Sequence, residues 1–274
     1  MMEIQLLRPV NCIITAIAVL IGAFVSESNL LSTSVWLAIV AAALITGAGN
    51  AYNDLCDLEI DKINRPQRPL PSGRVTQIQA FWIAGSSATI GLIMAALASP
   101  THGLAAAITI LCLWLYSRYL KRILLLGNLM VAALAAICFP FGALSAGSLG
   151  RAWIPAGFAF LFHFGREIVK DIEDMVGDRS VGARTIALTF GSRLAAGFVA
   201  VVYAFLVFST YVPYHVGIYG WEYLLIVGLV DLLVLGVIVH LIAFPLRRPL
   251  TTSTMLTVLM PLGQLSIVAG EFFR

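Results

Sequence analysis

The sequence predicts an all-α protein that crosses a membrane about nine times. Hydrophobic residues make up 60% of the 274 positions and charged residues only 11%, whereas a soluble domain is about 45–50% apolar and about 25% charged. The apolar residues form about nine long runs, and roughly 20 apolar residues suffice for one transmembrane helix. The runs show no alternation of period two, so a membrane β-barrel is excluded.

Each apolar run predicts one helix, and together the helices and their connections use the whole chain. About 30 residues are available per helix and connection, so residues 1–274 are expected to form a single transmembrane domain with no separate soluble part. The longer connections cover about 55–77 and 173–191. In chain order the predicted helices are near 9–26, 34–54, 78–98, 102–119, 127–147, 152–172, 192–212, 221–244 and 250–270.

The basic residues predict the orientation of these helices. With the N-terminus in the cytoplasm, 15 of the 17 Lys and Arg residues fall on the cytoplasmic side, Arg247 and Arg248 among them, and only Arg151 and Arg274 fall opposite. Cytoplasmic loops of membrane proteins are enriched in Lys and Arg. We therefore expect a multi-pass protein of the cell membrane whose N-terminus and long connections are cytoplasmic.

Most acidic residues are also predicted on the cytoplasmic side, although the topology rule for basic residues does not require this. Ten of the 14 Asp and Glu residues are cytoplasmic, and nine of these ten form two clusters at the ends of the second and sixth predicted helices. The offset from Asp57 to Asp174 is 117 residues, as is the offset from Asp61 to Asp178. This pattern favours two four-helix repeats followed by one extra helix.

The spacing within each cluster places several acids on one helical face. Asn53, Asp57 and Asp61 are four residues apart, with Asp54 beside them, and the second cluster has the same character. Such carboxylates repel one another unless a cation lies among them, and oxygen ligands favour Mg²⁺, or Mn²⁺, over zinc. The second cluster contains Asp171, Asp174 and Asp178.

Simpler interpretations of the acids remain open at this stage. They could be helix-end side chains exposed to water, or partners of Lys62, Arg65 and Lys170 in ion pairs. The ion-pair interpretation suits Glu59 and Glu173 best, since both point away from the shared faces.

Basic and polar side chains accompany the acids on the cytoplasmic side. A stiff, proline-rich segment after the first cluster carries Arg65, Arg68 and Arg74. Arginine binds phosphate through two parallel hydrogen bonds, and lysine binds it as a point charge. Acids that hold a divalent metal beside cations that hold phosphate predict a diphosphate site. Between the fourth and fifth predicted helices, the candidate side chains are Tyr116, Arg118, Lys121 and Asn128.

These motifs resemble those of the UbiA-type intramembrane prenyltransferases. The matching residues are Asn53-Asp54-x-x-Asp57-x-x-x-Asp61 and Asp174-x-x-x-Asp178, together with the segments Tyr116–Lys121 and Gly127-Asn128. The resemblance covers almost the whole chain. Within the family, the segments at 49–54, 64–74 and 166–174, and the opening Leu7-Arg8-Pro9, are most similar to archaeal digeranylgeranylglyceryl phosphate synthases.

The resemblance implies a helical bundle open to lipid, with a polar chamber at its cytoplasmic side. There Mg²⁺ would bridge the aspartates to the diphosphate of a polyprenyl donor, expected to be geranylgeranyl diphosphate. A lipid acceptor, geranylgeranylglyceryl phosphate, would capture the allylic cation. The implied metal ligands are Asn53, Asp57, Asp61, Asp174 and Asp178, with Asp54 and Asp171 close by. Arg68, Arg118 and Lys121 would stabilise the leaving group, beside Tyr116 and Asn128. Arg8, Arg65 and Arg74 are the candidates for the acceptor phosphate.

Other functions use similar features. An aromatic quinone precursor or a tetrapyrrole precursor could be the acceptor in the same chemistry, although Asp171 replaces the tyrosine pattern of the quinone branch and argues against 4-hydroxybenzoate. CDP-alcohol phosphatidyltransferases need an Asp-Gly-x-x-Ala-Arg element, which does not occur here. A cation-coupled transporter would place charges near the bilayer midplane. No nucleic-acid partner and no obligate protein partner is expected.

Overall fold

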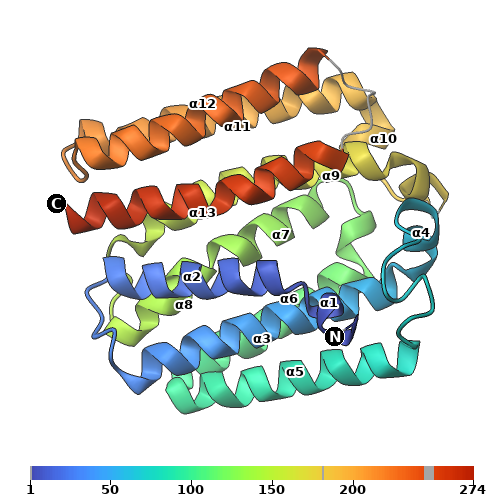
Figure 1. Ribbon diagram of the computed structural model, residues 1–274, viewed down its shortest axis with the longest axis horizontal. Helices are drawn as coiled ribbons and strands as arrows, with labels where there is room; N and C mark the ends of the chain where they lie inside the picture. The colour runs from blue at the N-terminus through green and yellow to red at the C-terminus, as the bar shows by residue number, and fades with distance from the viewer. Residues whose placement is uncertain (1, 181, 244–249) are drawn as a thin grey trace.

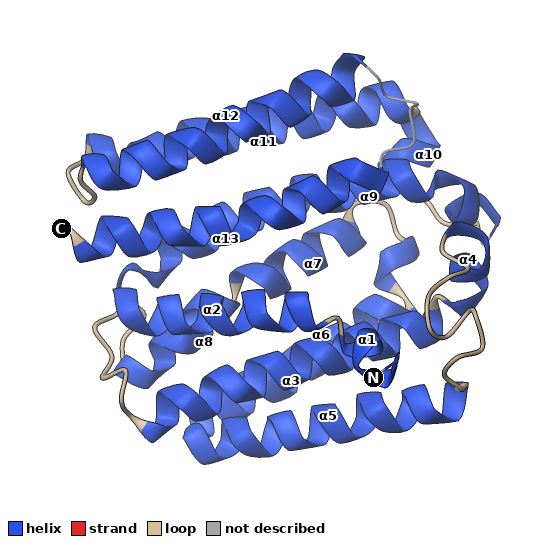
Figure 2. Cartoon of the chain, viewed as in Figure 1, coloured by secondary structure: helices blue, strands red, loops and turns tan. Residues whose placement is uncertain are grey.

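A computed structural model describes residues 2–180, 182–243 and 250–274, and every regular element in those ranges is a helix (Figures 1 and 2). Arg247 and Arg248 lie outside the described residues. The α-helices are α1 (Met2–Leu7), α2 (Pro9–Val25), α3 (Thr33–Cys56), α4 (Leu58–Asn64), α5 (Gln77–Ala98), α6 (Pro100–Arg118), α7 (Leu126–Ala136), α8 (Cys138–Ala143), α9 (Trp153–Ser180), α10 (Ile186–Phe190), α11 (Ser192–His215), α12 (Trp221–Ala243) and α13 (Leu250–Phe272).

Seven spans in the described residues are long and apolar enough to cross a membrane. They are α3, α5, α6, the segment Leu126–Ala146 that includes α7 and α8, α11, α12 and the Thr252–Phe272 part of α13. Two further predicted spans do not meet that standard: α2 is apolar but has only 17 residues, and α9 has 28 residues with charged side chains in its second half. The protein is therefore a multi-pass membrane protein with seven clear spans.

Helix boundaries differ from the sequence prediction where local chemistry intervenes. The span predicted at 127–147 is divided between α7 and α8, because Pro140 has no N–H with which to continue the hydrogen-bond ladder. The span predicted at 152–172 continues to Ser180, so the second acidic cluster lies on the same helix. The long connections contain the short helices α4 and α10.

The helices pack in two similar sets (Figure 1). In the first set α2 packs on α3, α3 on α5, and α5 on α6; in the second set α7 packs on α9, α9 on α11, and α11 on α12. Helix α13 contacts α12, α9 and α2, and α8 packs against α2, so the two sets are joined along α2, α8 and α13.

Glycines allow α2 and α8 to approach closely. A Cβ atom on Gly22 would lie 1.9 Å from the carbonyl oxygen of Phe139, and one on Gly142 would lie 1.9 Å from the carbonyl oxygen of Val19. Real Cβ contacts are never this short. Neither position therefore accepts a side chain without moving the helices apart.

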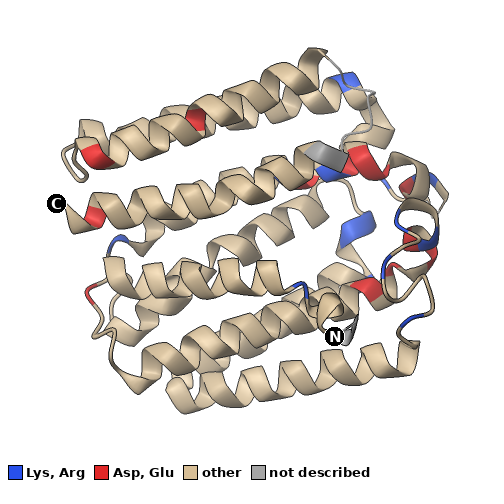
Figure 3. Cartoon of the chain, in the orientation of Figure 1, with Lys and Arg blue, Asp and Glu red and all other residues tan. Residues whose placement is uncertain are grey.

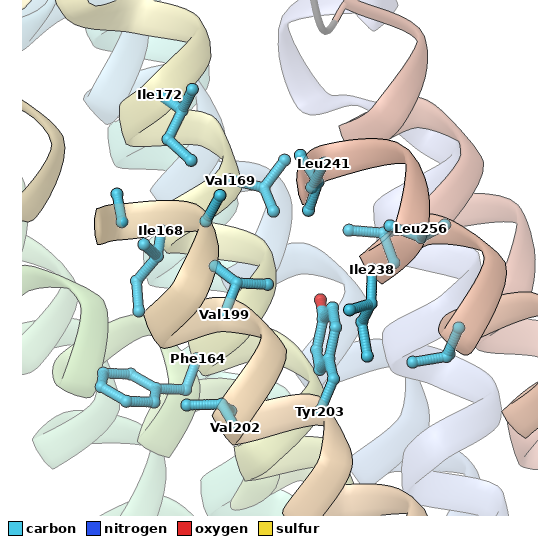
Figure 4. Close-up of a cluster of buried hydrophobic side chains, with 14 of the residues drawn as sticks. Phe164, Ile168, Val169, Ile172, Val199, Val202, Tyr203, Ile238, Leu241 and Leu256 are labelled. Carbon is cyan, nitrogen blue, oxygen red and sulfur yellow. The ribbon is translucent and has the colours of Figure 1, made fainter. Parts of the chain in front are cut away.

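Apolar side chains fill the interior of the second set and cover the outside of the bundle. Figure 4 shows Ile168 and Val169 of α9, Tyr203 of α11 and Leu256 of α13 within one cluster of buried side chains. The outer faces carry large exposed apolar side chains such as Leu232, which is 67% exposed. This distribution suits a hydrocarbon solvent and would be unfavourable in water.

Candidate functional site

Charged side chains gather at one end of the bundle, around α4, the last turns of α9 and the adjoining connections (Figure 3). At the opposite end, the main charged group is Arg151, which donates to Glu271 at 2.5 and 3.1 Å and lies 3.4 Å from Glu27. The charge-rich end contains both acidic clusters predicted from the sequence.

The first cluster lies at the junction between α3 and α4. The amide of Asp57 donates to the carbonyl of Asn53 at 2.9 Å, and the amide of Asp61 donates to that of Asp57 at 2.8 Å. Helical hydrogen bonding therefore continues past the end of α3 at Cys56. It keeps Asn53, Asp57 and Asp61 on the same helical face, as predicted. The Asn53 amide Nδ2 also donates to the Asp57 carboxylate at 2.8 Å.

The second cluster lies on the last turns of α9. Asn64, at the end of α4, forms hydrogen bonds to this part of α9. Asn64 Nδ2 donates to the carbonyl oxygen of Asp174 at 3.3 Å, and the amide of Gly177 donates to Asn64 Oδ1 at 3.1 Å. A Cβ on Gly177 would lie 2.4 Å from Asn64 Nδ2, so only glycine permits this approach. The end of α4 is thereby held against the end of α9.

The two clusters face one another across a polar cavity of about 90 Å³. We call this space the polar cavity. Asp57 and Asp174, 117 residues apart in sequence, thus border the same space, as a shared ion-binding site requires. The predicted side chains that line it are Arg8, Asn53, Asp57, Asp61, Arg65, Arg68, Tyr116, Lys121, Asp171, Asp174 and Asp178.

Basic side chains pair with most of the acids. Arg65 Nη2 lies 2.9 Å from Asp174 Oδ1, and Arg68 Nη1 donates to Asp61 Oδ2 at 2.6 Å. Lys121 pairs with Asp57. The proline-rich segment that carries Arg65 and Arg68 therefore folds back toward the acidic clusters.

Arg8 reaches the acids from the turn between α1 and α2. Its backbone is left-handed, with φ 51°, which is uncommon for a residue other than glycine. The side chain pairs with Asp54, which is 3% exposed and is also 3.5 Å from Arg68. Asp54 thus lies behind the polar cavity, where it holds two arginines in position.

Several oxygen atoms of the cavity lack a neutralising partner. Asn53 Oδ1 is buried without a hydrogen-bond donor, and the carboxylate of Asp178 has no ion pair or hydrogen bond within the described residues, although its backbone carbonyl accepts from Ala183. Burial raises the pKa of Asp178 to about 7, with further contributions from Asp174 and Asp57. Asp171 accepts one hydrogen bond, from Asn128 Nδ2 at 2.9 Å.

These oxygens fit a hard divalent cation. Mg²⁺ takes oxygen ligands, keeps several waters and commonly shares its coordination with a substrate phosphate. Across the described part of the chain, no three acidic, His or Cys side chains already converge as a complete metal-binding group. Lys121 and Arg65 are paired with Asp57 and Asp174 in this arrangement, so both acids would have to release a cation to bind a metal.

Other candidates from the sequence lie outside the polar cavity. Arg74 is exposed and donates to Ser72 Oγ at 2.9 Å and to the carbonyl of Gln67, and it lines neither cavity described in this section. Arg118 is also exposed and lines neither cavity. Asn128 is buried behind Asp171.

A second, larger cavity of about 770 Å³ extends into the bundle from the polar cavity. We call it the apolar cavity, since side chains such as Ile45, Leu134, Phe158, Leu206 and Val234 line it. Its size lies within the range of about 300–1,000 Å³ that is typical of ligand pockets. The residues that line both cavities are Arg8, Asn53, Arg65, Arg68, Tyr116, Glu167 and Lys170.

The sequence prediction missed three functional candidates on α9, namely Arg166, Glu167 and Lys170. Arg166 and Glu167 form an ion pair at 3.0 Å, and Lys170 lies 2.8 Å from Glu167. Their signal was available, because Arg166, Lys170 and Asp174 repeat every four residues and so share a helical face. The 117-residue offset also relates Asp54 to Asp171, two acids that the sequence analysis did include among the metal-site candidates.

Comparison with known proteins agrees with this architecture. The model of the "UbiA prenyltransferase family" matches residues 15–257. A digeranylgeranylglyceryl phosphate synthase from Methanopyrus kandleri is 38% identical over 227 residues, which cover 81% of this chain and 82% of the relative.

Solved structures share the fold over nearly their whole length. A structure described as giving insight into digeranylgeranylglyceryl phosphate synthase in membranes matches with a TM-score of 0.76 and 28% identity, and covers 100% of this chain and 98% of that chain. A UbiA homologue from Archaeoglobus fulgidus, bound to GPP and Mg²⁺, matches with a TM-score of 0.67 and 17% identity over 98% of both chains. The chain is a member of the UbiA prenyltransferase family.

Proposed function

We propose that this protein transfers a polyprenyl group, geranylgeranyl, from its allylic diphosphate to geranylgeranylglyceryl phosphate, in the synthesis of archaeal membrane ether lipids. The observation that carries the proposal is the junction of the two cavities: acids and cations that suit Mg²⁺ and a diphosphate open directly onto an apolar space that suits a polyprenyl chain. The name of the Methanopyrus kandleri relative supports the choice of acceptor.

The metal would be held by oxygen atoms of both acidic clusters. Asn53, Asp57, Asp61, Asp174 and Asp178 line the polar cavity together with Asp171, and Asp54 lies directly behind it. Bound Mg²⁺, or Mn²⁺, neutralises the charge that develops on the leaving diphosphate. The Mg²⁺ in the Archaeoglobus fulgidus homologue supports this assignment.

The cations of the polar cavity would bind the diphosphate itself. Lys121, Arg65 and Arg68 each pair with an acid here, so metal binding to those acids frees the three cations for phosphate oxygens. Preorganised positive charge around a leaving group is among the largest contributions to catalysis. Tyr116 lines both cavities and so borders the position of the reacting carbon.

The reaction exchanges one C–O bond for another. The bond between C1 of the polyprenyl chain and its diphosphate oxygen breaks, and the acceptor hydroxyl oxygen bonds to C1 and loses its proton, which leaves an ether and diphosphate. The apolar cavity holds the polyprenyl tail, where each buried CH₂ contributes about 0.8 kcal/mol. Its walls also keep bulk water from capturing the allylic cation.

We extend the proposal to topology: nine helices cross the membrane, as two four-helix repeats and one extra helix, within a single domain. The matched packing of α2–α3–α5–α6 and α7–α9–α11–α12 supports the repeat, and α13 is the additional helix. Helices α2 and α9 are then the remaining two spans; α2 is short, with 17 residues, and α9 carries charged side chains. The gathering of basic residues at one end supports a cytoplasmic location for the N-terminus and the polar cavity.

A reconstituted reaction tests the function. The purified protein receives geranylgeranyl diphosphate and Mg²⁺ or EDTA, with geranylgeranylglyceryl phosphate, a quinone precursor or a tetrapyrrole precursor as acceptor, and products are identified by mass spectrometry. We expect the ether product from the glyceryl phosphate only, and none in EDTA. Transfer to an aromatic acceptor instead would overturn the choice of acceptor, and full activity in EDTA would overturn the metal site.

Variants of the two clusters test the site in the same assay. Asp57→Asn and Asp174→Asn should each lose most of the transfer while the protein still inserts and folds. Glu59→Gln is the matched control, because Glu59 belongs to the same acidic segment but is exposed and pairs with Lys62 at 2.7 Å. Near-normal turnover by both aspartate variants would refute the assignment.

A further inference from the structure

We infer that Arg166 and Lys170, held in place by Glu167, bind the phosphate of the acceptor lipid. This inference rests on the proposed function and adds to it a second anion site, which adjoins the diphosphate site where the two cavities meet. The ligand class is a monophosphate ester at the head of a lipid whose hydrocarbon chain enters the apolar cavity.

The position of the three side chains is the first argument. Glu167 and Lys170 line both cavities, and Arg166 lines the apolar one, so the group lies where a polar head and an apolar tail would meet. Lys170 lies four residues after Arg166 and three after Glu167, so it shares a helical face with each, and ion pairs to Glu167 join the three side chains. Arg166 is anchored from a second helix, since its Nη2 donates to Thr257 Oγ1 of α13 at 3.0 Å.

The charge of the group is the second argument. Glu167, with 7% of its side chain exposed, lies 3.0 Å from Arg166 and 2.8 Å from Lys170. Two cations therefore share one carboxylate, so the three side chains together carry one net positive charge; the other acids that Lys170 faces are Asp171 and Asp178 of the polar cavity. The other basic side chains of the site each pair with a carboxylate of the two acidic clusters; they are Arg65, Arg68, Lys121 and Arg8. This arrangement is expected if a metal ion replaces these side chains at the carboxylates when metal and diphosphate bind.

Unused hydrogen-bond donors are the third argument. Arg166 Nε is buried without an acceptor in the described residues, although Nη1 and Nη2 are both satisfied. Lys170 Nζ makes both of its hydrogen bonds to Glu167, so its third proton is available. A buried donor without a partner is unfavourable, and a phosphate oxygen would satisfy it.

The earlier candidates for the acceptor phosphate are less suitable on this structure. Arg74 lies on an exposed loop and lines neither cavity in the described structure. Arg8 pairs with buried Asp54, which lies behind the polar cavity, and Arg65 is assigned above to the diphosphate. Arg166 and Lys170 instead share a single carboxylate, Glu167, where the two cavities meet.

The test compares two acceptors that differ only in the phosphate: geranylgeranylglyceryl phosphate and geranylgeranylglycerol. With saturating geranylgeranyl diphosphate and Mg²⁺, we expect the wild type to prefer the phosphate acceptor in kcat/KM. Arg166→Gln and Lys170→Gln should raise KM for that acceptor by about tenfold to a hundredfold, as expected for one lost charge-assisted contact. KM for the diphosphate donor should stay within about twofold of wild type in both variants.

Arg179→Gln is the matched control, because Arg179 lies on the same helix, is exposed and lines neither cavity. Equal use of both acceptors by the wild type overturns the inference without any variant. So does a variant that raises KM for the donor and leaves that for the phosphate acceptor unchanged. If the wild type transfers only to aromatic acceptors, the proposed function fails instead, which distinguishes the two outcomes.

Discussion

Asp178→Asn isolates the role of metal binding, because the carboxylate of Asp178 lines the polar cavity and has no ion pair or hydrogen bond among the described residues. The substitution keeps the shape of the side chain and removes one charge. In EDTA it should leave the free energy of unfolding unchanged or raise it slightly, since a half-buried negative charge beside Asp174 and Asp57 is lost. In contrast, Asp61→Asn removes the charge that Arg68 contacts at 2.6 Å and leaves Asp54, at 3.5 Å, as its remaining carboxylate, so it should cost about 1–3 kcal/mol in EDTA.

With Mg²⁺ and inorganic pyrophosphate present, Asp178→Asn should instead be less stable than the wild type, because it binds the ligands less tightly. A ligand present at about 100 times its Kd stabilises the native state by about 2.7 kcal/mol. Loss of a direct metal ligand should lower the affinity for the metal by about a hundredfold or more. Substitution of a residue that only hydrogen-bonds to a metal ligand already lowers affinity by about 10–100-fold. The variant then gains only about 0.4 kcal/mol, and its ligand-induced rise in Tm falls short of wild type by about 5–9 °C.

Thermal unfolding of the detergent-solubilised protein, followed with and without the ligands, measures both effects. Glu59→Gln is the control, because its side chain is 73% exposed and its loss should change neither Tm by more than about a degree. A full Mg²⁺-dependent rise in Tm for Asp178→Asn would show that Asp178 is not a ligand, and a large loss of stability in EDTA would contradict its unpaired state.

Three further predictions concern neighbouring features. Lys121→Ala should raise KM for the prenyl donor or lower kcat by about 10²-fold, because it removes a cation of the diphosphate site; unchanged donor kinetics would remove Lys121 from the site. Arg74→Ala should leave KM for both substrates within about twofold of wild type, because Arg74 bonds only within its own loop; a selective rise in acceptor KM would restore it as a phosphate ligand. Gly22→Val should lower Tm sharply, since its Cβ would lie 1.9 Å from the Phe139 carbonyl oxygen, and size-exclusion chromatography with thermal unfolding checks this.

The membrane class, the approximate helix positions and the two acidic clusters follow from the sequence because their signals are local. Hydropathy runs mark the helices, and a four-residue spacing places Asn53, Asp57 and Asp61 on one side even where α3 gives way to α4. The break at Pro140 was also readable in the sequence and was overlooked, since a proline within a helical run interrupts the hydrogen-bond ladder. The prediction of nine spans stays a proposal for the two helices that are short or charged.

The sequence by itself therefore determined the chemistry available to this protein: carboxylates, arginines and a lysine at one end of an apolar bundle. Only the tertiary structure decided which of them meet, because the decisive contacts join distant segments, such as Asn64 and Asp174, 110 residues apart. It brought Arg65 and Arg68 to the acids and left Arg74 on the surface, although all three lie in one segment. The direction of a side chain depends on the packing of neighbouring helices, and no local pattern encodes that packing.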